Sequence, residues 1–250
     1  MLRSLTLALL LLPQEPKDKN SHGVLVELFT SQGCSSCPPA DTLLITLESL
    51  GINPAPVTRL AFHVDYWDNL GWKDPFAKEI FTERQKAYSA AHAENTLWTP
   101  QFRVNGTSVR GHEELKKAIQ AALSEKAQFA IRILSAVTKD RKVIVEASVE
   151  KLDPKLLVSE SLVLRMAVFE NELETKAAKG ENQGRTLAEG FVVRQWSDSQ
   201  KFSGESGKVL KVMKELPLDA DWNPKRLGVA LVLEDSRAMK VLEVASTSLR

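Results

Sequence analysis

The chain has 250 residues, of which 43% are hydrophobic, so it can bury either one large core or two of ordinary size. Its 33 basic and 32 acidic residues leave a formal net charge of +1 at pH 7. This balance argues against nucleic acid or an anionic membrane surface as the main partner.

The first 22 residues have the composition of a secretory signal and leader. Arg3 precedes a leucine-rich run from Leu5 to Leu12, and polar residues and prolines follow. The run is too short to cross a bilayer, which takes about 20 residues, and no later segment is long and apolar enough to do so. We therefore expect export to the periplasm or the medium, and no stable membrane span after signal removal. The alternative is an apolar leader without a targeting role, because no clear small-x-small cleavage site follows.

Residues 23–125 alternate between short apolar runs and stretches with helical periodicity, which predicts the order β-α-β-α-β-β-α. Asp74 and Pro75 are typical of a helix start, and Asn105-Gly106 is a strong hairpin signal. A strand after a helical crossover is most simply parallel to the strand before it. The expected strands are 24–29, 57–67, 102–104 and 107–109, and the expected helices are 39–51, 74–92 and 112–124.

From residue 126 onward, helical periodicity gives way to short alternating runs that are typical of strands. About seven strands without crossover helices favour an antiparallel sandwich. We therefore predict an α+β protein with an α/β domain over 23–125 and an all-β, sandwich-like domain over 126–250. The expected strands of the second domain are 129–137, 142–149, 161–169, 190–196, 208–213, 227–233 and 241–245.

Both cysteines, Cys34 and Cys37, lie in the run GCSSCPPAD between the first expected strand and the first expected helix. In this context a Cys-x-x-Cys pair is typical of a redox centre. The unpaired N–H groups and partial positive charge of a helix amino terminus favour a thiolate over a thiol. We expect Cys34 to be the exposed nucleophile and Cys37 to be the thiol that resolves the mixed disulfide.

The two prolines complicate this placement, because a residue before proline avoids helical dihedral angles. We therefore expect the regular helix to begin at Pro39, which leaves both sulfur atoms outside its first turn. Asp41 suits the helix dipole as an acid of the first turn, but its negative charge would raise the pKa of a nearby thiol. The residues alone leave open which effect is larger.

Two other roles for the cysteine pair stay open. A structural disulfide would close so short a loop that it removes only roughly 2 kcal/mol worth of chain entropy. A structural zinc site needs four ligands, and the two cysteines and four histidines show no recognisable ligand spacing. Two thiolates could nevertheless hold copper(I), which prefers soft ligands.

The order of elements and three local motifs resemble the thioredoxin superfamily over residues 23–124. The motifs are FTSQGCSSCPP, TPQFRVNG and the closing GHEELKKAIQAAL. More narrowly, VELFTSQGCSSCPPAD, FHVDYWDNLGWKDPFA, FTERQKAY and GENQGRTLAEGFVVRQW resemble an exported thioredoxin-like family labelled domain of unknown function 1223. The resemblance implies a thioredoxin-like fold for the first domain.

The resemblance also implies site residues. Cys34 and Cys37 would form a redox-active disulfide, and Pro100 would be a cis-proline facing them. Thr99 would offer its backbone to an extended protein or peptide substrate. Thioredoxins carry Trp before the first cysteine and Gly-Pro between the pair, whereas this chain has Gly33 and Ser35-Ser36. Because the intervening residues tune the reduction potential, the direction of electron flow does not follow from the resemblance.

Several other side chains are expected near the cysteine pair, because the loops after the first two strands meet at one sheet edge. Trp67 and Trp98, with Tyr66 and Trp72, could form a peptide-binding rim or simply pack a long loop. Proton transfer is a further hypothesis for two acids, Glu27 and Asp65. Glu27 is one position out of phase with the buried acid of thioredoxins and could instead be a strand-edge or paired carboxylate, and Asp65 could instead cap its turn. Two basic residues are expected to be structural, His63 as a sheet residue and Arg185 as an exposed loop residue.

These expectations combine into an exported thiol-disulfide oxidoreductase that acts on protein or peptide thiols, with an unidentified redox partner and no cofactor beyond its own disulfide. The alternative is a copper(I)-binding or non-catalytic partner-binding module on the same fold.

Overall fold

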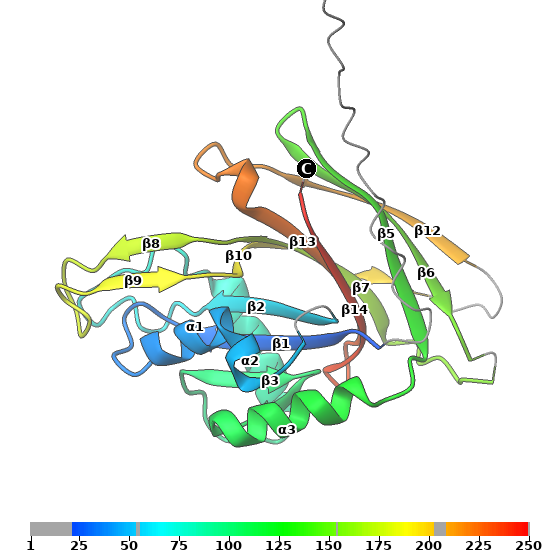
Figure 1. Cartoon of the computed structure of the whole chain (residues 1–250), viewed down its shortest axis with the longest axis horizontal. Helices are drawn as coiled ribbons and strands as arrows, with labels where there is room; N and C mark the ends of the chain where they lie inside the picture. The colour runs from blue at the N-terminus through cyan, green and yellow to red at the C-terminus, as the bar shows by residue number, and fades with distance from the viewer. Residues whose placement is uncertain (1–21, 54–55, 154, 203–208, 250) are drawn as a thin grey trace, which may run out of the picture.

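The computed structural model describes residues 22–53, 56–153, 155–202 and 209–249. All but His22 of the expected signal and leader lies outside these ranges. The described chain is a mixed α/β structure with one large β-sheet and few helices (Figure 1). Within the described residues, no helix has the length and apolar character needed to cross a membrane.

The first half contains four strands and three α-helices in the expected order. They are β1 (Val24–Thr30), α1 (Pro38–Ile45), the 3-10 helix η1 (Leu47–Leu50), β2 (Val57–His63), α2 (Glu79–Ala91), β3 (Gln101–Val104), β4 (Thr107–Val109) and α3 (Gly111–Leu123). The second half continues with β5 (Phe129–Lys139), β6 (Lys142–Lys151), β7 (Leu162–Glu170), β8 (Leu173–Lys176), β9 (Thr186–Glu189), β10 (Val192–Trp196), β11 (Gln200–Lys201), β12 (Val209–Pro217), η2 (Pro224–Arg226), β13 (Leu227–Asp235) and β14 (Lys240–Ser248).

The helix boundaries differ from the sequence expectation, by one residue at each end of α3 and more at α1 and α2. Helix α1 begins at Pro38 rather than Pro39, because Cys37 adopts helical dihedral angles although it precedes a proline. The helix ends at Ile45, and the rest of the expected segment forms η1, which Gly51 terminates with a left-handed φ of 73°. Helix α2 begins at Glu79 and not near Asp74, whose carboxylate accepts the N–H groups of Phe76 in the same loop and of Gln32 in the cysteine turn.

The large sheet runs through both halves of the chain, in the order β14-β13-β7-β10-β2-β1-β3-β4. Strands β1 and β2 are parallel, as expected, and β3 is antiparallel to β1. Strand β10 joins the halves because it pairs parallel to β2, with Val192 opposite Ala61. All seven expected strands of the second half are present, but β8, β9 and β11 were not expected, since two to four residues are too few for an alternation pattern. The boundary near residue 125 stays a prediction, but strands on its two sides share one sheet.

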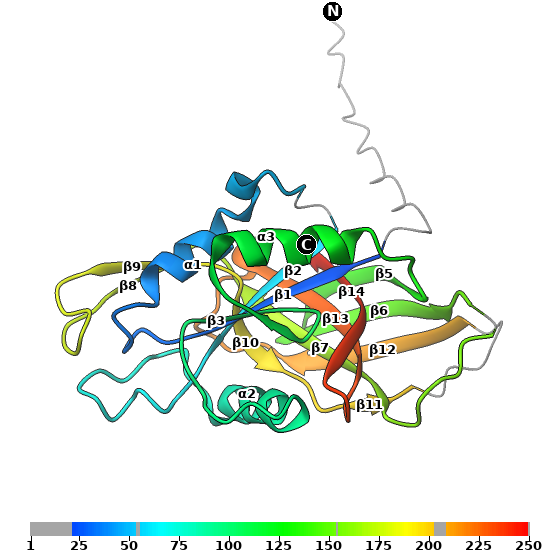
Figure 2. The same cartoon turned by 90° about the horizontal axis from the view of Figure 1, so that it is seen from below.

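The two faces of the large sheet are covered by different elements. Helix α2 covers one face, over a core that includes Phe29, Phe62 and Trp196. On the other face, α1 and α3 pack over β1 to β4, and the three-stranded sheet β12-β6-β5 packs over β7 and β13. Figure 2 shows α2 on the opposite side of the sheet from α1 and α3. The cysteine turn follows β1 on the side of α1.

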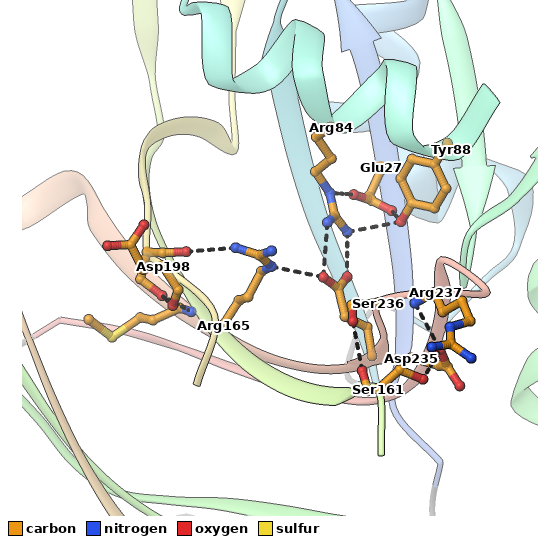
Figure 3. Close-up of polar contacts among 12 residues, drawn as sticks. Glu27, Arg84, Tyr88, Ser161, Arg165, Asp198, Asp235, Ser236 and Arg237 are labelled. Carbon is orange, nitrogen blue, oxygen red and sulfur yellow. Dashed lines mark hydrogen bonds and ion pairs between the residues drawn. The ribbon is translucent and has the colours of Figure 1, made fainter. Parts of the chain in front are cut away.

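A buried charge network joins the two halves on the face covered by α2 (Figure 3). The guanidinium of Arg84 donates to Glu27 at 2.7 Å and to Glu234 at 2.9 Å. Tyr88 donates to the second oxygen of Glu27, and Arg165 donates to Glu234 at 2.9 Å. The network thereby links β1, α2, β7 and β13, and each buried carboxylate has a cationic partner, which buried charges require.

Candidate functional site

The two cysteines lie in the turn that connects β1 to α1, and both are free thiols. The expectation of an exposed nucleophile is wrong, because Cys34 is only 1% exposed and Cys37 is fully buried. The side chains between them, Ser35 and Ser36, are exposed. The exposed surface of the turn is therefore formed by the serines, and the sulfur of Cys34 lies beneath it.

The Cys34 sulfur lies in a ring of polar groups. It is 3.3 Å from the Ser36 hydroxyl and 3.8 Å from the Thr99 carbonyl oxygen, to which it donates in its protonated form. A hydrogen bond from the Cys37 thiol, followed by those from Ser36, outweighs burial and lowers the pKa of Cys34 to about 6. At neutral pH Cys34 is therefore mainly a thiolate, which is the nucleophilic form.

Cys37 has the opposite character. It occupies the N-cap position of α1, and its pKa is strongly raised by burial and by the negative charge of Cys34. The pair therefore consists of one ionised and one protonated sulfur, which share a hydrogen bond.

The helix amino terminus contributes less to this asymmetry than the sequence suggests. Pro38 and Pro39 have no N–H group, and the N–H groups of Ala40 and Asp41 both donate to the Cys37 carbonyl oxygen, at 2.8 and 3.1 Å. No open amide of the first turn is left for a thiolate. The helix end therefore offers no free N–H group to the Cys34 sulfur. Cys37 and Ser36 are its hydrogen-bond donors instead.

A cluster of buried titratable side chains lies beneath the turn. Burial raises the pKa of Asp41 to about 7 and that of Glu189, on β9, also to about 7. His63, at the end of β2, lies 2.7 Å from Asp74. Burial opposes charge on His63, but Asp74 outweighs it and raises the histidine pKa to about 9, while His63 lowers the pKa of Asp74 despite burial. This cluster can hold and release protons near neutral pH.

The two acids singled out from sequence for proton transfer have other partners. Glu27 faces the α2 side of the sheet and pairs with Arg84, in keeping with the alternative of a paired carboxylate. Asp65 accepts a hydrogen bond from the hydroxyl of Thr82 at 2.6 Å. The structure instead places Asp41 on the helix that carries Cys37. Its spacing of four residues from Cys37, one helical turn, is the sequence signal for this proximity.

His63 is buried at the end of its strand, but it belongs to the proton-holding cluster and its Nε2 has no hydrogen-bond partner. The alternation of β2 accounts for this placement. His63 shares a face with Val57 and Ala61, which pack on the α1 side, whereas Leu60 and Phe62 face α2.

A groove of about 270 Å³ opens beside the turn. Its lining includes Ser36, Leu43, Trp98, Pro100 and Arg110. The Arg110 guanidinium lies 4.8 Å from the Trp98 ring. The Thr99–Pro100 peptide bond is cis, as the resemblance implied. The groove is mainly apolar, with a cation in its lining.

The remaining aromatic side chains of the loop after β2 pack around the turn in different ways. Trp67 is half-buried and packs against Gly33, where a Cβ atom would lie 3.0 Å from the Trp67 Cβ atom. Trp72 donates its ring N–H to the side chain of Gln32 at 3.0 Å. Burial and the nearby cysteines raise the pKa of Tyr66 to about 12. Because Gly33 has no side chain, the Trp67 side chain can pack directly against the turn.

The comparison with protein families is decisive for classification. The family model described as "Protein of unknown function (DUF1223)" matches residues 25–234. The chain belongs to this family. No curated protein matches it significantly.

Two solved structures are similar over most of this family member. The protein AGR_C_4864 from Agrobacterium tumefaciens is 26% identical, with a TM-score of 0.59 over 90% of this chain and 94% of that chain. HBP35 of Porphyromonas gingivalis is 14% identical, with a TM-score of 0.69 over 92% of this chain and 76% of that chain. At that identity the second likeness concerns the fold alone.

Sequence reasoning missed the part of the site that comes from the second half. Asn182, Glu181 and Glu189 of the β8–β9 hairpin all bond to the cysteine turn. The turn formers of GENQGRTLAEG marked this segment as a loop, but nothing local indicated its destination. Among the described residues, no group of three or more His, Cys, Asp or Glu side chains is arranged to hold a metal ion.

Proposed function

We propose that this protein is a thiol-disulfide oxidoreductase whose Cys34 and Cys37 exchange disulfides with a protein or peptide. The observation that carries the proposal is the placement of both free cysteines in one turn, with the Ser36 hydroxyl 3.3 Å and the Thr99 carbonyl oxygen 3.8 Å from the Cys34 sulfur; these surroundings agree with a lowered pKa for Cys34 and a raised one for Cys37. An ionised nucleophile beside a protonated resolving thiol is the arrangement that a two-step exchange requires.

In the reducing direction, the Cys34 thiolate attacks a substrate disulfide. A Cys34–substrate disulfide forms, and the other substrate sulfur leaves as a thiolate and takes up a proton. Cys37 then loses its proton and attacks the Cys34 sulfur, which releases the second substrate thiolate. Two electrons pass to the substrate, and a Cys34–Cys37 disulfide remains for a dithiol partner to reduce. The oxidising direction is the reverse, with a disulfide partner.

Asp41 is the proposed acceptor for the Cys37 proton. It lies one helical turn beyond Cys37, it is buried, and its pKa of about 7 allows it to take and return a proton near neutral pH. His63 and Glu189 interact electrostatically with Asp41 and would tune this exchange. Glu27 and Asp65 have no part in this proposal.

The groove beside Ser36 is the proposed substrate site. An extended peptide would lie across Trp98 and Pro100, with the Thr99 backbone beside the Cys34 sulfur. Trp67 would shape the other side of the turn through its contact with Gly33. The apolar lining suits an apolar side chain next to the substrate cysteine.

The same proposal includes a thioredoxin-like arrangement over 23–125, followed by a sandwich-like β domain, and export by the amino-terminal signal. In support, the parallel β1–β2 pair is followed by the antiparallel β3–β4 hairpin, with the cysteine turn between β1 and α1.

Equilibration with reduced and oxidised glutathione tests the activity. We expect the purified protein to interconvert between dithiol and disulfide forms, and Cys34→Ser to abolish insulin reduction and disulfide transfer. A dithiol that does not convert in any physiological glutathione ratio would exclude the proposal. A copper(I) site lost in either cysteine variant, together with no redox cycling, would favour the metal-binding alternative.

The substrate groove has its own test. We expect Trp98→Ala to raise the KM for a disulfide peptide roughly tenfold, as for loss of an aromatic anchor, with little change in kcat. Trp222→Ala is the matched control, because Trp222 belongs to the core beneath the three-stranded sheet. Equal effects on KM in the two variants would remove the groove from the proposal.

A further inference from the structure

The loop between β8 and β9 binds the backbone of the cysteine turn from the other half of the chain. The Asn182 amide donates one hydrogen bond to the carbonyl oxygen of Gln32 and one to that of Cys34, each at 2.9 Å. The Asn182 side chain is almost fully buried. Both donors of one side chain are therefore used to hold two carbonyl groups of the turn.

Asn182 is itself held in place by its loop. Arg185 donates a hydrogen bond to its side-chain oxygen at 3.0 Å, and the Arg185 N–H donates to its backbone oxygen at 3.0 Å. Gly180, with a φ of 75°, lies against Trp72 so closely that a Cβ atom would be 2.8 Å from the Trp72 Cβ atom. The loop is thus fitted closely to the segment after β2.

The β8–β9 hairpin bonds to the turn at two further points, one in the loop and one on β9. A carboxylate oxygen of Glu181 accepts from the Ser35 N–H at 2.9 Å. The Glu189 carboxylate accepts from the Gln32 side-chain amide at 2.8 and 3.0 Å. Bonds from the hairpin therefore reach Gln32, Cys34 and Ser35, which precede the Ser36 groups that contact the Cys34 sulfur.

The position of the Cys34 carbonyl group determines which hydrogen-bond donors reach the Cys34 sulfur. That carbonyl accepts from both Asn182 and the Cys37 N–H, the latter at 3.2 Å, so it fixes the bend of the turn. The same bend brings the Ser36 hydroxyl and N–H onto the Cys34 sulfur. If the carbonyl moved, these donors would separate from the sulfur and the thiolate would lose stabilisation.

We propose that the β8–β9 loop is a positioning element for the nucleophilic cysteine and that Asn182 is its positioning residue. The loop keeps Cys34 in the geometry that stabilises its thiolate. This role rests on the proposed function, since it serves a reactive Cys34, but it makes a separate claim about one residue.

Alkylation of Cys34 by iodoacetamide across a pH series tests the claim in the full-length dithiol protein. In Asn182→Ala we expect the Cys34 pKa to rise by about one unit, so that the alkylation rate at pH 5 falls roughly tenfold. The rate well above the pKa should stay unchanged, because the thiolate is then fully formed in both proteins. If Asn182 had a purely structural role, the pH dependence of Cys34 alkylation would be the same in Asn182→Ala and in the wild type.

Two further variants make the test decisive. Asn171→Ala is the matched control, because the Asn171 side-chain oxygen accepts from the Phe191 N–H, away from the turn, and we expect its profile to match the wild type. Asn182→Ser keeps a single donor and should shift the profile in the same direction by about threefold at pH 5; it carries the test if the alanine variant does not fold.

A wild-type profile in a folded Asn182 variant would overturn the proposal, as would an equal shift in Asn171→Ala. These outcomes are distinct from failure of the proposed function. Alkylation reports on Cys34 whether or not the protein exchanges disulfides, whereas redox cycling in glutathione reports on exchange itself.

Discussion

Nδ1 of His63 lies 2.7 Å from a carboxylate oxygen of Asp74, and both side chains are buried directly beneath the cysteine turn. The same oxygen accepts the Gln32 N–H at 2.8 Å, so the ion pair also anchors the beginning of the turn. The pair persists at neutral pH because Asp74 raises the histidine pKa against the effect of burial. The ion pair therefore supports the turn and keeps His63 protonated at neutral pH.

This ion pair predicts a loss of stability in alkaline solution. The folded-state pKa of His63, about 9, exceeds its ordinary value of 6.5, so the folded protein binds the extra proton between these values. The stabilisation is complete below pH 6.5 and is lost as the pH rises through 9. We expect His63→Asn to remove about 3 kcal/mol of this pH dependence in urea unfolding. His112→Asn, an exposed histidine, should keep it; equal slopes in wild type and His63→Asn would contradict the prediction.

Asp41 predicts an effect that can be separated from that of His63. Burial raises its folded-state pKa from 3.8 to about 7, so its contribution is complete below pH 3.8 and is lost as the pH rises through 7. Asparagine resembles the protonated acid. We expect Asp41→Asn to be as stable as the wild type near pH 4 and about 4 kcal/mol more stable at pH 8, by urea unfolding.

The control for Asp41 is Asp140→Asn, in the exposed turn between β5 and β6. Asp140 has a φ of 50°, which asparagine tolerates, so we expect a change within about 0.5 kcal/mol at either pH. A destabilised Asp41→Asn at pH 8 would show that the carboxylate is needed in its charged form.

The interaction between the two sulfurs predicts how two substitutions of Cys37 change the pKa of Cys34. Cys37 is the largest contributor to the lowered pKa of Cys34, so Cys37→Ala should raise that pKa by more than about one unit. Cys37→Ser keeps a hydroxyl donor and should raise it less. Ultraviolet absorbance of the thiolate measures both. Identical values in the two variants would mean that the donor is not the cause.

Arg84 predicts a large stability effect away from the cysteine pair. Its replacement by methionine leaves Glu27 and Glu234 buried without their shared cation, and we expect a loss of about 3–5 kcal/mol in the free energy of unfolding. Lys86→Met removes an exposed ion pair with Glu83 on the same helix and should cost less than about 1 kcal/mol. Similar losses in the two variants would argue against the buried network as a link between the halves.

The local pattern of the sequence was sufficient for much of the fold. Strand alternation in the second half, the Asn105-Gly106 hairpin and the strand-turn-helix setting of Cys34 are all expressed within a few neighbouring residues, and the structure contains them. These features depend on backbone dihedral preferences and on the period of apolar side chains, which act over one element at a time.

The pairing of the halves and the surroundings of the cysteines were decided by tertiary structure. Asn182 and Cys34 are 148 residues apart, and β10 meets β2 in a single sheet, but no local pattern specifies which distant segments meet. Glu27 became a structural partner of Arg84 because strand alternation points it to the α2 face. Burial raises the pKa of Asp41, and Asp74 raises the pKa of His63 against the effect of burial, so both shifts depend on neighbours that the fold brings together. The sequence by itself determined that both cysteines lie in one turn between a strand and a helix; the packing of distant elements decided which groups surround them, since burial and charge act through space and not along the chain.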